Sequence, residues 1–177
     1  MKLIILDRDG VINQDSDLYI KSPEEWIPLP GSLEAIARLN QWGYRVVVCT
    51  NQSGIGRGLF GMDTLNAIHD KMIKAATHAG GTIDAIFFCP HTNADNCGCR
   101  KPKAGMLKEI AARYNVDLAG VPVIGDSLRD LQSALAVGGQ PMLVLTGKGK
   151  KTQVDPALPA GTPVFADLAA AVKSLTA

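Results

Sequence analysis

The chain has 177 residues, and its 18 Lys or Arg and 17 Asp or Glu give a formal net charge of +1 at pH 7. That length suits one domain over residues 1–177, and a hydrophobic content of 46% excludes disorder as the main state. Near-neutral charge provides no broad basic field for nucleic acid, and no apolar run reaches the roughly 18 residues of a membrane helix. The lack of a signal-peptide pattern predicts a cytoplasmic protein with reduced cysteines.

Short apolar segments alternate along the chain with segments of helical periodicity. Strands are predicted at 2–6, 44–49, 83–89, 121–125, 141–145 and 164–165, with helices over 33–40, 65–76, 107–114, 128–135 and 167–175. The segment 148–161 is rich in Lys, Pro and Gly and is expected to be an exposed loop. This alternation predicts an α/β fold: a doubly wound, Rossmann-like parallel sheet with helices on both faces and no large cap domain.

Polar clusters follow the first four predicted strands. They are Asp7-Arg8-Asp9-Gly10, the segment 50–54, Cys89-Pro90-His91, and Gly125-Asp126-Ser127 with Asp130 beyond. The carboxyl ends of parallel strands lie along one edge of the sheet, and ligands bind at that edge. Helix capping could explain Asp126 or Ser53 singly, but it is a poor explanation for all four clusters.

The acidic residues of these clusters predict a magnesium site. Carboxylates this close repel one another unless a cation neutralises them, and oxygen ligands beside a phosphate suit Mg²⁺. Of Asp7 and Asp9, one can attack while the other handles a proton. The hydroxyl of Thr50 can bind phosphate oxygens, and Lys101 supplies positive charge for the developing negative charge. Four carboxylates are expected to converge: Asp7, Asp9, Asp126 and Asp130.

A second metal is predicted from four soft ligands within eleven positions. Cys89-x-His91 is followed by Cys97-x-Cys99, and Zn²⁺ binds a tetrahedron of such ligands in structural sites. Cysteines two positions apart cannot easily form a disulfide, so free thiols are the alternative to a zinc loop at 89–99. Because two cationic residues directly follow Cys99, the zinc is expected to orient Arg100 and Lys101 toward the substrate.

Together the motifs resemble the haloacid dehalogenase (HAD) superfamily of phosphatases. They are the run from Asp7 to Asn13, Thr50-Asn51-Gln52-Ser53-Gly54, Cys99-Arg100-Lys101-Pro102, and Gly125-Asp126 with Asp130. In motif order they look like the D-glycero-D-manno-heptose 1,7-bisphosphate 7-phosphatases and the related histidinol-phosphatases, over essentially the whole chain. Ser127 stands where members of this family often carry Lys, which departs from their pattern.

The resemblance implies a Mg²⁺-dependent phosphatase that removes the 7-phosphate through an aspartyl-phosphate. Its pathway would supply ADP- or GDP-heptose precursors of lipopolysaccharide or related glycans. By resemblance, Asp7 is the nucleophile and Asp9 the acid and base; Asp7, the backbone carbonyl of Asp9, and Asp126 hold Mg²⁺. Thr50 and Lys101 would bind the phosphoryl group. The implied substrate contacts are Asp15, Tyr19, Asn51, Gln52, Ser53, Arg57 and Arg100.

Three alternatives stay open. One is a histidinol-phosphate phosphatase of the same family. A second is a phospho-accepting receiver domain, whose acceptor Asp would follow the third strand, where the zinc loop begins. A third is a zinc-dependent interaction module without catalysis, which the intact acidic cluster disfavours. The expected partner is a phosphorylated sugar, with neither nucleic acid nor a membrane involved, and the chain is expected to be a monomer.

A few other residues receive structural interpretations. Trp26 and Trp42 are expected to pack against the fold, and Cys49 is expected to be a small core residue. His69 is interpreted as an ordinary helix residue, and Lys148 as a solvated loop lysine.

Overall fold

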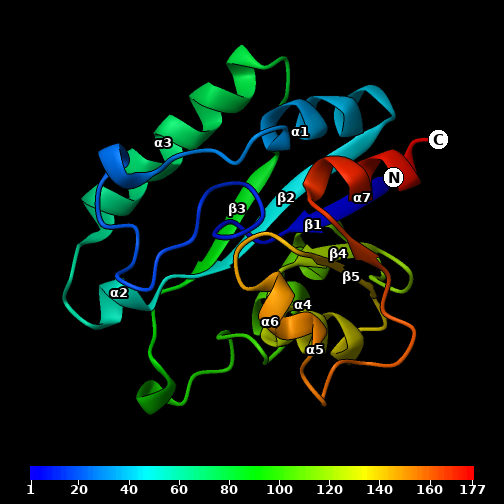
Figure 1. Ribbon diagram of the computed structural model, residues 1–177. Coiled ribbons are helices and arrows are strands. Elements are labelled where there is room, and N and C mark those ends of the chain that lie inside the picture. Colours follow the sequence, from blue (N-terminus) through cyan, green and yellow to red (C-terminus); the bar gives the residue numbers. More distant parts are fainter.

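A six-stranded parallel sheet forms the centre of the computed structural model, which describes all residues 1–177 (Figure 1). The strand order is β3-β2-β1-β4-β5-β6, so the chain moves outward from β1 to β3 and then crosses back to place β4 on the other side of β1. This reversal leaves a crevice at the carboxyl ends of β1 and β4. The strands are β1 (Lys2–Leu6), β2 (Tyr44–Asn51), β3 (Ala85–Cys89), β4 (Pro122–Gly125), β5 (Gln140–Val144) and β6 (Val164–Phe165).

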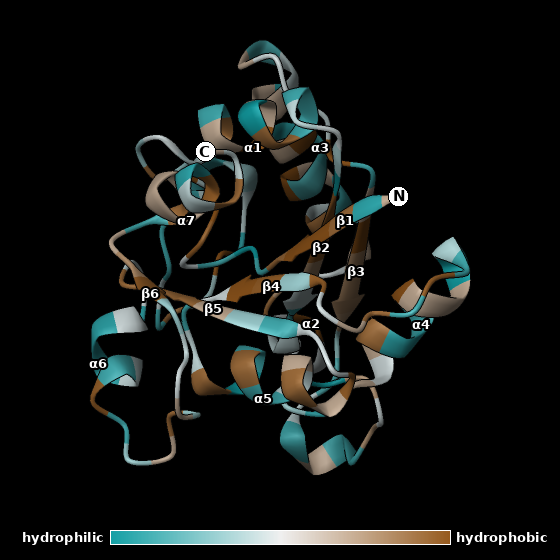
Figure 2. Ribbon diagram, turned by 90° about the vertical axis from the view of Figure 1, so that its right-hand side faces the viewer, coloured by the Kyte–Doolittle hydropathy of each residue, from teal (hydrophilic) through white to brown (hydrophobic).

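Helices cover both faces of the sheet, which confirms the predicted fold class. On one face lie α1 (Ser32–Gln41), α3 (Met62–His78) and α7 (Leu168–Leu175), and on the other lie α4 (Gly105–Tyr114) and α5 (Leu128–Ala136) (Figure 1). Successive strand residues point to opposite faces, so Ile4 and Leu6 enter the first core while Leu3 and Ile5 enter the second. Figure 2 shows the hydrophobic character of β2 and β3 between these layers.

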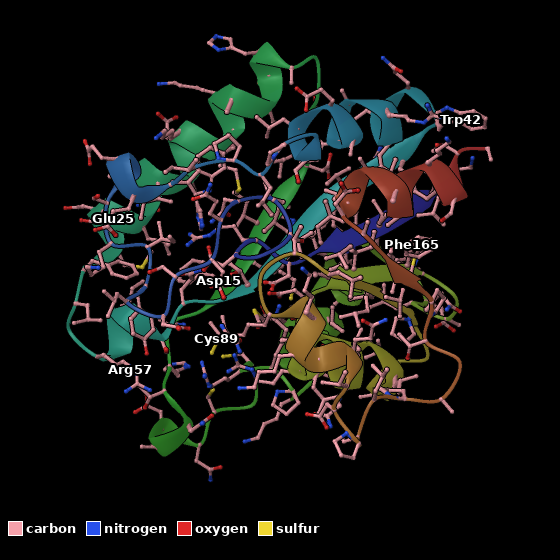
Figure 3. The ribbon with its side chains drawn as sticks, in the orientation of Figure 1. Asp15, Glu25, Trp42, Arg57, Cys89 and Phe165 are labelled. Atoms are coloured by element: carbon pink, nitrogen blue, oxygen red, sulfur yellow. The ribbon has the colours of Figure 1, made fainter.

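Two aromatic residues assigned to packing have different environments. Trp26 is 1% exposed and belongs to the first core, as predicted. Trp42 packs only in part, because it is 45% exposed. Trp42 directly follows the last residue of α1, so it lies beyond the buried stripe of that helix, at the periphery of the molecule (Figure 3).

The predicted loop at 148–161 contains a short helix, α6 (Gly149–Gln153), which corrects that expectation. Thr152 anchors it by donating a hydrogen bond from Oγ1 to the backbone oxygen of Asp126 at 2.7 Å. Other short elements are α2 (Ser53–Gly56) and the 3₁₀ turns η1 (Pro23–Glu25) and η2 (Asn93–Asp95). None of the helices combines the length and apolar character needed to cross a bilayer.

Candidate active site

A polar pocket of about 270 Å³ lies at the carboxyl edge of the sheet, and only one of its 17 lining residues is hydrophobic. Eleven residues predicted for the site line it, whereas Arg57 does not. The guanidinium of Arg57 instead lies 5.9 Å from the ring centroid of Tyr19, outside that lining. The eleven are Asp7, Asp9, Asp15, Tyr19, Thr50, Asn51, Gln52, Ser53, Arg100, Lys101 and Asp126.

Three carboxylates meet in this pocket, with ligand oxygens of Asp7, Asp126 and Asp130 within 4.8 Å of one another. Asp7 Oδ1 accepts hydrogen bonds from the Arg8 backbone N–H at 2.9 Å and from Lys101 Nζ at 3.1 Å. Asp126 Oδ2 accepts one from the Lys148 backbone N–H at 2.8 Å. Asp7 Oδ2 and Asp126 Oδ1 accept none from the protein, so this pair of oxygens fits a hard cation such as Mg²⁺.

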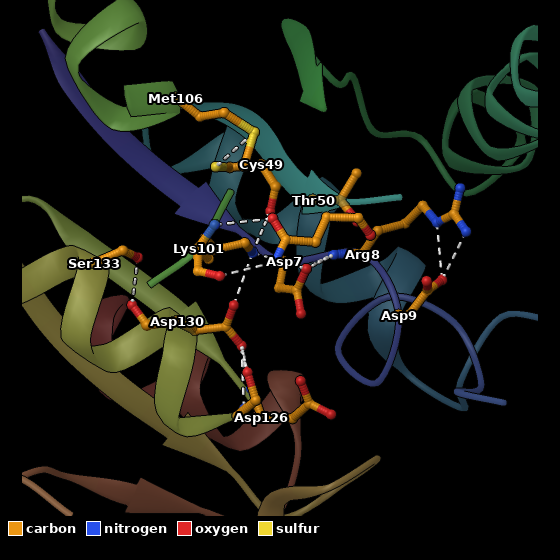
Figure 4. A network of polar contacts seen from close by, with 12 residues as sticks. Asp7, Arg8, Asp9, Cys49, Thr50, Lys101, Met106, Asp126, Asp130 and Ser133 are labelled. Carbon is orange, nitrogen blue, oxygen red and sulfur yellow. Dashed lines mark hydrogen bonds and ion pairs between the residues drawn. The ribbon is translucent and has the colours of Figure 1, made fainter. Parts of the chain in front are cut away.

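The third carboxylate, Asp130, has a supporting place in the cluster. Its Oδ1 accepts a hydrogen bond from Lys101 Nζ at 2.7 Å (Figure 4). Its Oδ2 accepts from the backbone N–H of Asp126 and from the backbone N–H and hydroxyl of Ser127, which caps α5. Because both oxygens are engaged, Asp130 fixes the end of β4 and its ammonium partner rather than offering a free ligand atom.

The electrostatics of the cluster also favour a cation. Burial and the negative charge of Asp130 raise the pKa of Asp7 to about 7. Burial and the charge of Asp7 raise the pKa of Asp126 to about 9. Both shifts mean that ionising the carboxyl groups of Asp7 and Asp126 costs free energy unless positive charge lies nearby. A divalent ion between Asp7 and Asp126 would supply that charge.

Lys101 is the buried cation already present in the site. Its Nζ donates to Asp7, to Asp130 and to the backbone oxygen of Cys49, the last at 2.7 Å (Figure 4). Burial alone would lower the pKa of Lys101, but Asp130 and Asp7 raise it above its usual value, so the ammonium stays charged. Asn51 fixes the backbone of Lys101 with two hydrogen bonds, of 3.0 and 3.2 Å.

Asp9 does not join the cluster, which corrects the expectation that four carboxylates converge. Its side chain is drawn toward Arg8, whose Nε donates to Asp9 Oδ1 at 2.9 Å, while Gln52 Nε2 donates to Oδ2 at 3.1 Å. Burial alone would raise the pKa of Asp9, but Arg8 holds it below its usual range. Gln52 Nε2 also donates to Thr50 Oγ1 at 3.0 Å, so Gln52 links Asp9 to Thr50, both of which are predicted catalytic residues.

Lys148 and His69 have partners that their interpretations did not include. Lys148 is exposed, as expected of a loop lysine, but it is not without partners: its Nζ pairs with Asp15 at 2.9 Å, and its backbone N–H donates to Asp126 Oδ2. His69 is 7% exposed, and its Nε2 lies 3.1 Å from Arg8 Nη1. Burial and the charge of Arg8 lower the pKa of His69 to about 4, so the ring is neutral near pH 7.

Arg129 lines the pocket and was missed by the sequence analysis. It is the second residue of α5, directly beyond the Gly125-Asp126-Ser127 motif, and this position near a strand's carboxyl end is the signal that could have found it. Burial lowers the pKa of Arg100, and the positive charge of Arg129 lowers it further. The pocket therefore holds two neighbouring guanidinium groups that an anionic substrate group could neutralise.

Close glycine contacts shape the wall beside Asp126. Gly10 has φ +86° and Gly147 has φ +56°, and a Cβ at either position would overlap the Asp126 carboxylate. Left-handed backbone accommodates glycine without steric cost. Both glycines therefore let loops approach the carboxylate closely.

Replacing Gly10 with alanine is expected to destabilise the fold more than replacing Gly120. Both glycines have positive φ, +86° and +73°, but a Cβ at Gly120 meets no atom within 4 Å. Gly120→Ala should cost about 1–2 kcal/mol from backbone strain alone, and Gly10→Ala should cost more because Asp126 must move. Urea unfolding measures both, and equal losses would contradict the overlap at Asp126.

The predicted zinc ligands also come together. Ligand atoms of Cys89, His91, Cys97 and Cys99 lie within 4.8 Å of one another, and no disulfide joins the cysteines. The Cys89–Cys97 and Cys97–Cys99 sulfur distances are both 3.6 Å, and His91 Nδ1 lies 3.4 Å from Cys99 Sγ. A tetrahedral zinc site has ligand–ligand edges of about 3.5–3.8 Å. Cys89 and Cys99 lie closer, at 2.8 Å. The donor set fits zinc.

Comparisons with known proteins place this site in a family. The HAD-hydrolase-like family model matches residues 98–171, and the polynucleotide kinase 3 phosphatase model matches residues 2–127. A D-glycero-beta-D-manno-heptose-1,7-bisphosphate 7-phosphatase from Bordetella bronchiseptica is 63% identical, with 99% of this chain and 98% of the relative covered. The chain belongs to the D-glycero-beta-D-manno-heptose-1,7-bisphosphate 7-phosphatase family of HAD-like hydrolases. The predicted superfamily and hydrolase activity are confirmed.

Other relatives extend the likeness to solved structures. The phosphatase of the same name from Pseudomonas putida is 53% identical, with 99% of each chain covered. The crystal structure of the D,D-heptose 1,7-bisphosphate phosphatase from B. bronchiseptica, complexed with magnesium and phosphate, aligns with a TM-score of 0.97 at 63% identity, over 99% of this chain and 98% of that one. The corresponding enzyme from Burkholderia thailandensis aligns with a TM-score of 0.80 at 56% identity, over 99% and 98%.

Proposed function

We propose that this chain removes the 7-phosphate of D-glycero-β-D-manno-heptose 1,7-bisphosphate with Mg²⁺ held by Asp7, Asp126 and the backbone carbonyl of Asp9. The supporting observation is the pair of free oxygens on Asp7 and Asp126, beside a buried Lys101, in a fold whose 63%-identical relative was crystallised with magnesium and phosphate. The proposal includes a single-domain, cytoplasmic, monomeric enzyme whose product enters the synthesis of lipopolysaccharide or related glycans.

The residues support a two-step displacement. The Asp7 carboxylate attacks phosphorus, the bond from phosphorus to the sugar oxygen breaks, and Asp9 gives its proton to that oxygen. A water then attacks the aspartyl-phosphate, Asp9 takes the water's proton, and inorganic phosphate leaves as the Asp7 carboxylate is restored. The incoming phosphate puts negative charge beside Asp9, which favours its protonation before the first step. Bound Mg²⁺ would neutralise negative charge shared by Asp7 and the phosphoryl group.

The remaining residues hold the substrate. Thr50 and Lys101 contact the transferring phosphoryl group, because Lys101 already bonds the attacking carboxylate. Arg100, Arg129 and Lys148 line the pocket and are the cations available for a second phosphate. This favours a bisphosphate over histidinol phosphate, whose other end carries an amine. Asp15, Tyr19, Asn51, Gln52 and Ser53 complete the proposed substrate contacts, and Arg57 lies next to them against Tyr19.

Phosphate release from a panel of substrates tests this function. With Mg²⁺ present, the heptose 1,7-bisphosphate should show the highest kcat/KM, and phosphorus NMR should show loss of the 7-phosphate with the 1-phosphate retained. Histidinol phosphate and fructose 1,6-bisphosphate serve as comparison substrates. A higher kcat/KM for histidinol phosphate would favour the related activity. No turnover of any phosphomonoester would contradict a phosphatase.

We further propose that Cys89, His91, Cys97 and Cys99 hold a structural Zn²⁺ that orients the cations after Cys99. Arg100 Nε donates to Asn93 Oδ1 at 2.8 Å, within the same loop. Loss of zinc should therefore raise KM by displacing Arg100 and lower kcat by displacing Lys101, while Asp7, Asp9 and Asp126, which follow other strands, should stay in place. Metal analysis should find one zinc per chain. Zinc-stripped protein that remains folded, with KM unchanged, would contradict the orienting role.

A further inference from the structure

Arg8 lies between the two aspartates of the Asp7-Arg8-Asp9 motif and is 0% exposed. A guanidinium is rarely buried without partners, because desolvation of its charge is costly. Its partners are Asp9 on one side and His69 of α3 on the other (Figure 4 draws the Asp9 side). These contacts join residues 61 positions apart in the sequence. None of the steps proposed above uses Arg8 or His69.

The two oxygens of Asp9 have unequal surroundings. Oδ1 accepts hydrogen bonds from Arg8 Nε and Asn13 Nδ2, both at 2.9 Å, and forms an ion pair with Arg8 Nη2 at 2.9 Å. Oδ2 accepts a single hydrogen bond, from Gln52 at 3.1 Å, and Asp9 lines the pocket with 23% of its side chain exposed. The hydrogen-bonding capacity of Oδ1 is therefore used inside the protein, whereas Oδ2 can still form a hydrogen bond with the substrate.

His69 restrains the other end of the Arg8 guanidinium. All five guanidinium hydrogens are donors, so the contact from Nη1 requires His69 Nε2 to accept and places the ring proton on Nδ1. The ring is held in the buried face of α3, beside Ile68, and is tilted against Phe88 at a centroid distance of 6.5 Å. The guanidinium of Arg8 is planar and is hydrogen-bonded to Asp9 on one side and to His69 on the other. Its orientation is therefore fixed from two separate parts of the fold, the loop after β1 and helix α3.

We propose that Arg8 and His69 are positioning residues that bind Oδ1 of Asp9 and so present Oδ2 as the oxygen that exchanges the proton with the substrate. The inference rests on the proposed role of Asp9 as acid and base. Its physical basis is geometric: a proton donor is effective only within hydrogen-bond reach of the leaving oxygen, and a freely rotating carboxylate spends time in other orientations.

Leaving-group dependence distinguishes this role from general support of the fold. A sugar alkoxide needs a proton as it leaves, whereas the nitrophenolate of p-nitrophenyl phosphate leaves without one. Misplacing Oδ2 should therefore slow phosphoryl transfer from the sugar and spare the aryl ester. The quantity to compare is kcat/KM, which reports the steps up to formation of the aspartyl-phosphate.

His69→Phe removes the acceptor while keeping an aromatic ring, and His69→Gln keeps an acceptor for Arg8. With the heptose bisphosphate, His69→Phe should lower kcat/KM about tenfold or more, and with p-nitrophenyl phosphate less than about twofold. His69→Gln should retain both values within about threefold. The matched control is His78→Gln, an exposed histidine on the same helix, which should change neither value.

Equal losses on both substrates, or no loss on either, would overturn the positioning role, as would a His69→Gln variant as slow as His69→Phe. A crystal structure of His69→Phe gives a readout independent of activity: Arg8 should shift and the Asp9 carboxylate should rotate, and an unchanged Arg8–Asp9 pair would refute the proposal. If the wild-type enzyme released no phosphate from either ester, the proposed function itself would fail, whereas failure of the inference alone leaves wild-type turnover intact.

Discussion

Asp7→Asn is expected to lower phosphate release at least about 10⁴-fold, the scale of loss when a covalent nucleophile is removed. Asp7 Oδ2 is the oxygen without a protein partner, and an amide group in its place can neither attack phosphorus nor bind a cation strongly. Steady-state phosphate release with the heptose bisphosphate measures the loss. Residual activity within tenfold of wild type would contradict the nucleophile assignment.

The same substitution should leave the metal-free fold intact. The pKa of Asp7 is raised to about 7 from its ordinary 3.8, mainly by burial, so ionising this group costs stability as pH rises above the unfolded value. The neutral amide avoids that cost, and metal-free Asp7→Asn should melt no lower than wild type at pH 7. Mg²⁺ should raise Tm in wild type and much less in the variant. Asp63→Asn, an exposed residue of α3, is the matched control.

Lys101→Met is expected to impair both stability and catalysis. It removes the only side chain that bonds Asp7 and Asp130 together, and leaving buried carboxylates without their cation costs about 3–5 kcal/mol. Phosphate release should fall about 10²–10³-fold, because the ammonium would stabilise charge developing on the phosphoryl oxygens. Urea unfolding and phosphate release measure the two effects.

A second variant separates the effects of Lys101. Adding Asp130→Asn to Lys101→Met removes one of the unpaired charges, so part of the lost stability should return while activity stays low. Lys108→Met, an exposed lysine of α4, controls for loss of a positive charge. A Lys101→Met enzyme as stable and active as the Lys108 variant would show that the buried ion pairs do not support the site.

The fold was predictable because its strands and long helices carry strong patterns. Alternate residues of β1 enter two cores, and the stripes of α3 and α5 recur at helical spacing. The five residues of α6 have no apolar periodicity, and tertiary contacts such as the Thr152 hydrogen bond hold this helix in place. A pattern also cannot say where a helix's buried stripe stops, which is why the exposure of Trp42 was missed.

The site was predictable where residue type and strand end coincide, as for Asp7, Thr50 and Asp126. Orientation was not, because the spacing of Asp7 and Asp9 indicates side chains on the same side, while the intervening Arg8 pulls Asp9 away. A lone arginine or histidine in a helix resembles a surface residue until its long-range partner is known. For that reason Arg129 and His69 emerged only from the structure.

The nearly complete absence of apolar side chains from the pocket has a consequence for inhibition. A ligand there gains little from dehydration of hydrocarbon surface, so its affinity must come from ionic contacts and hydrogen bonds. Such binding weakens as ionic strength rises. Uncharged drug-like molecules should therefore be poor inhibitors, and effective ones will need charged groups, which hinder their entry into cells.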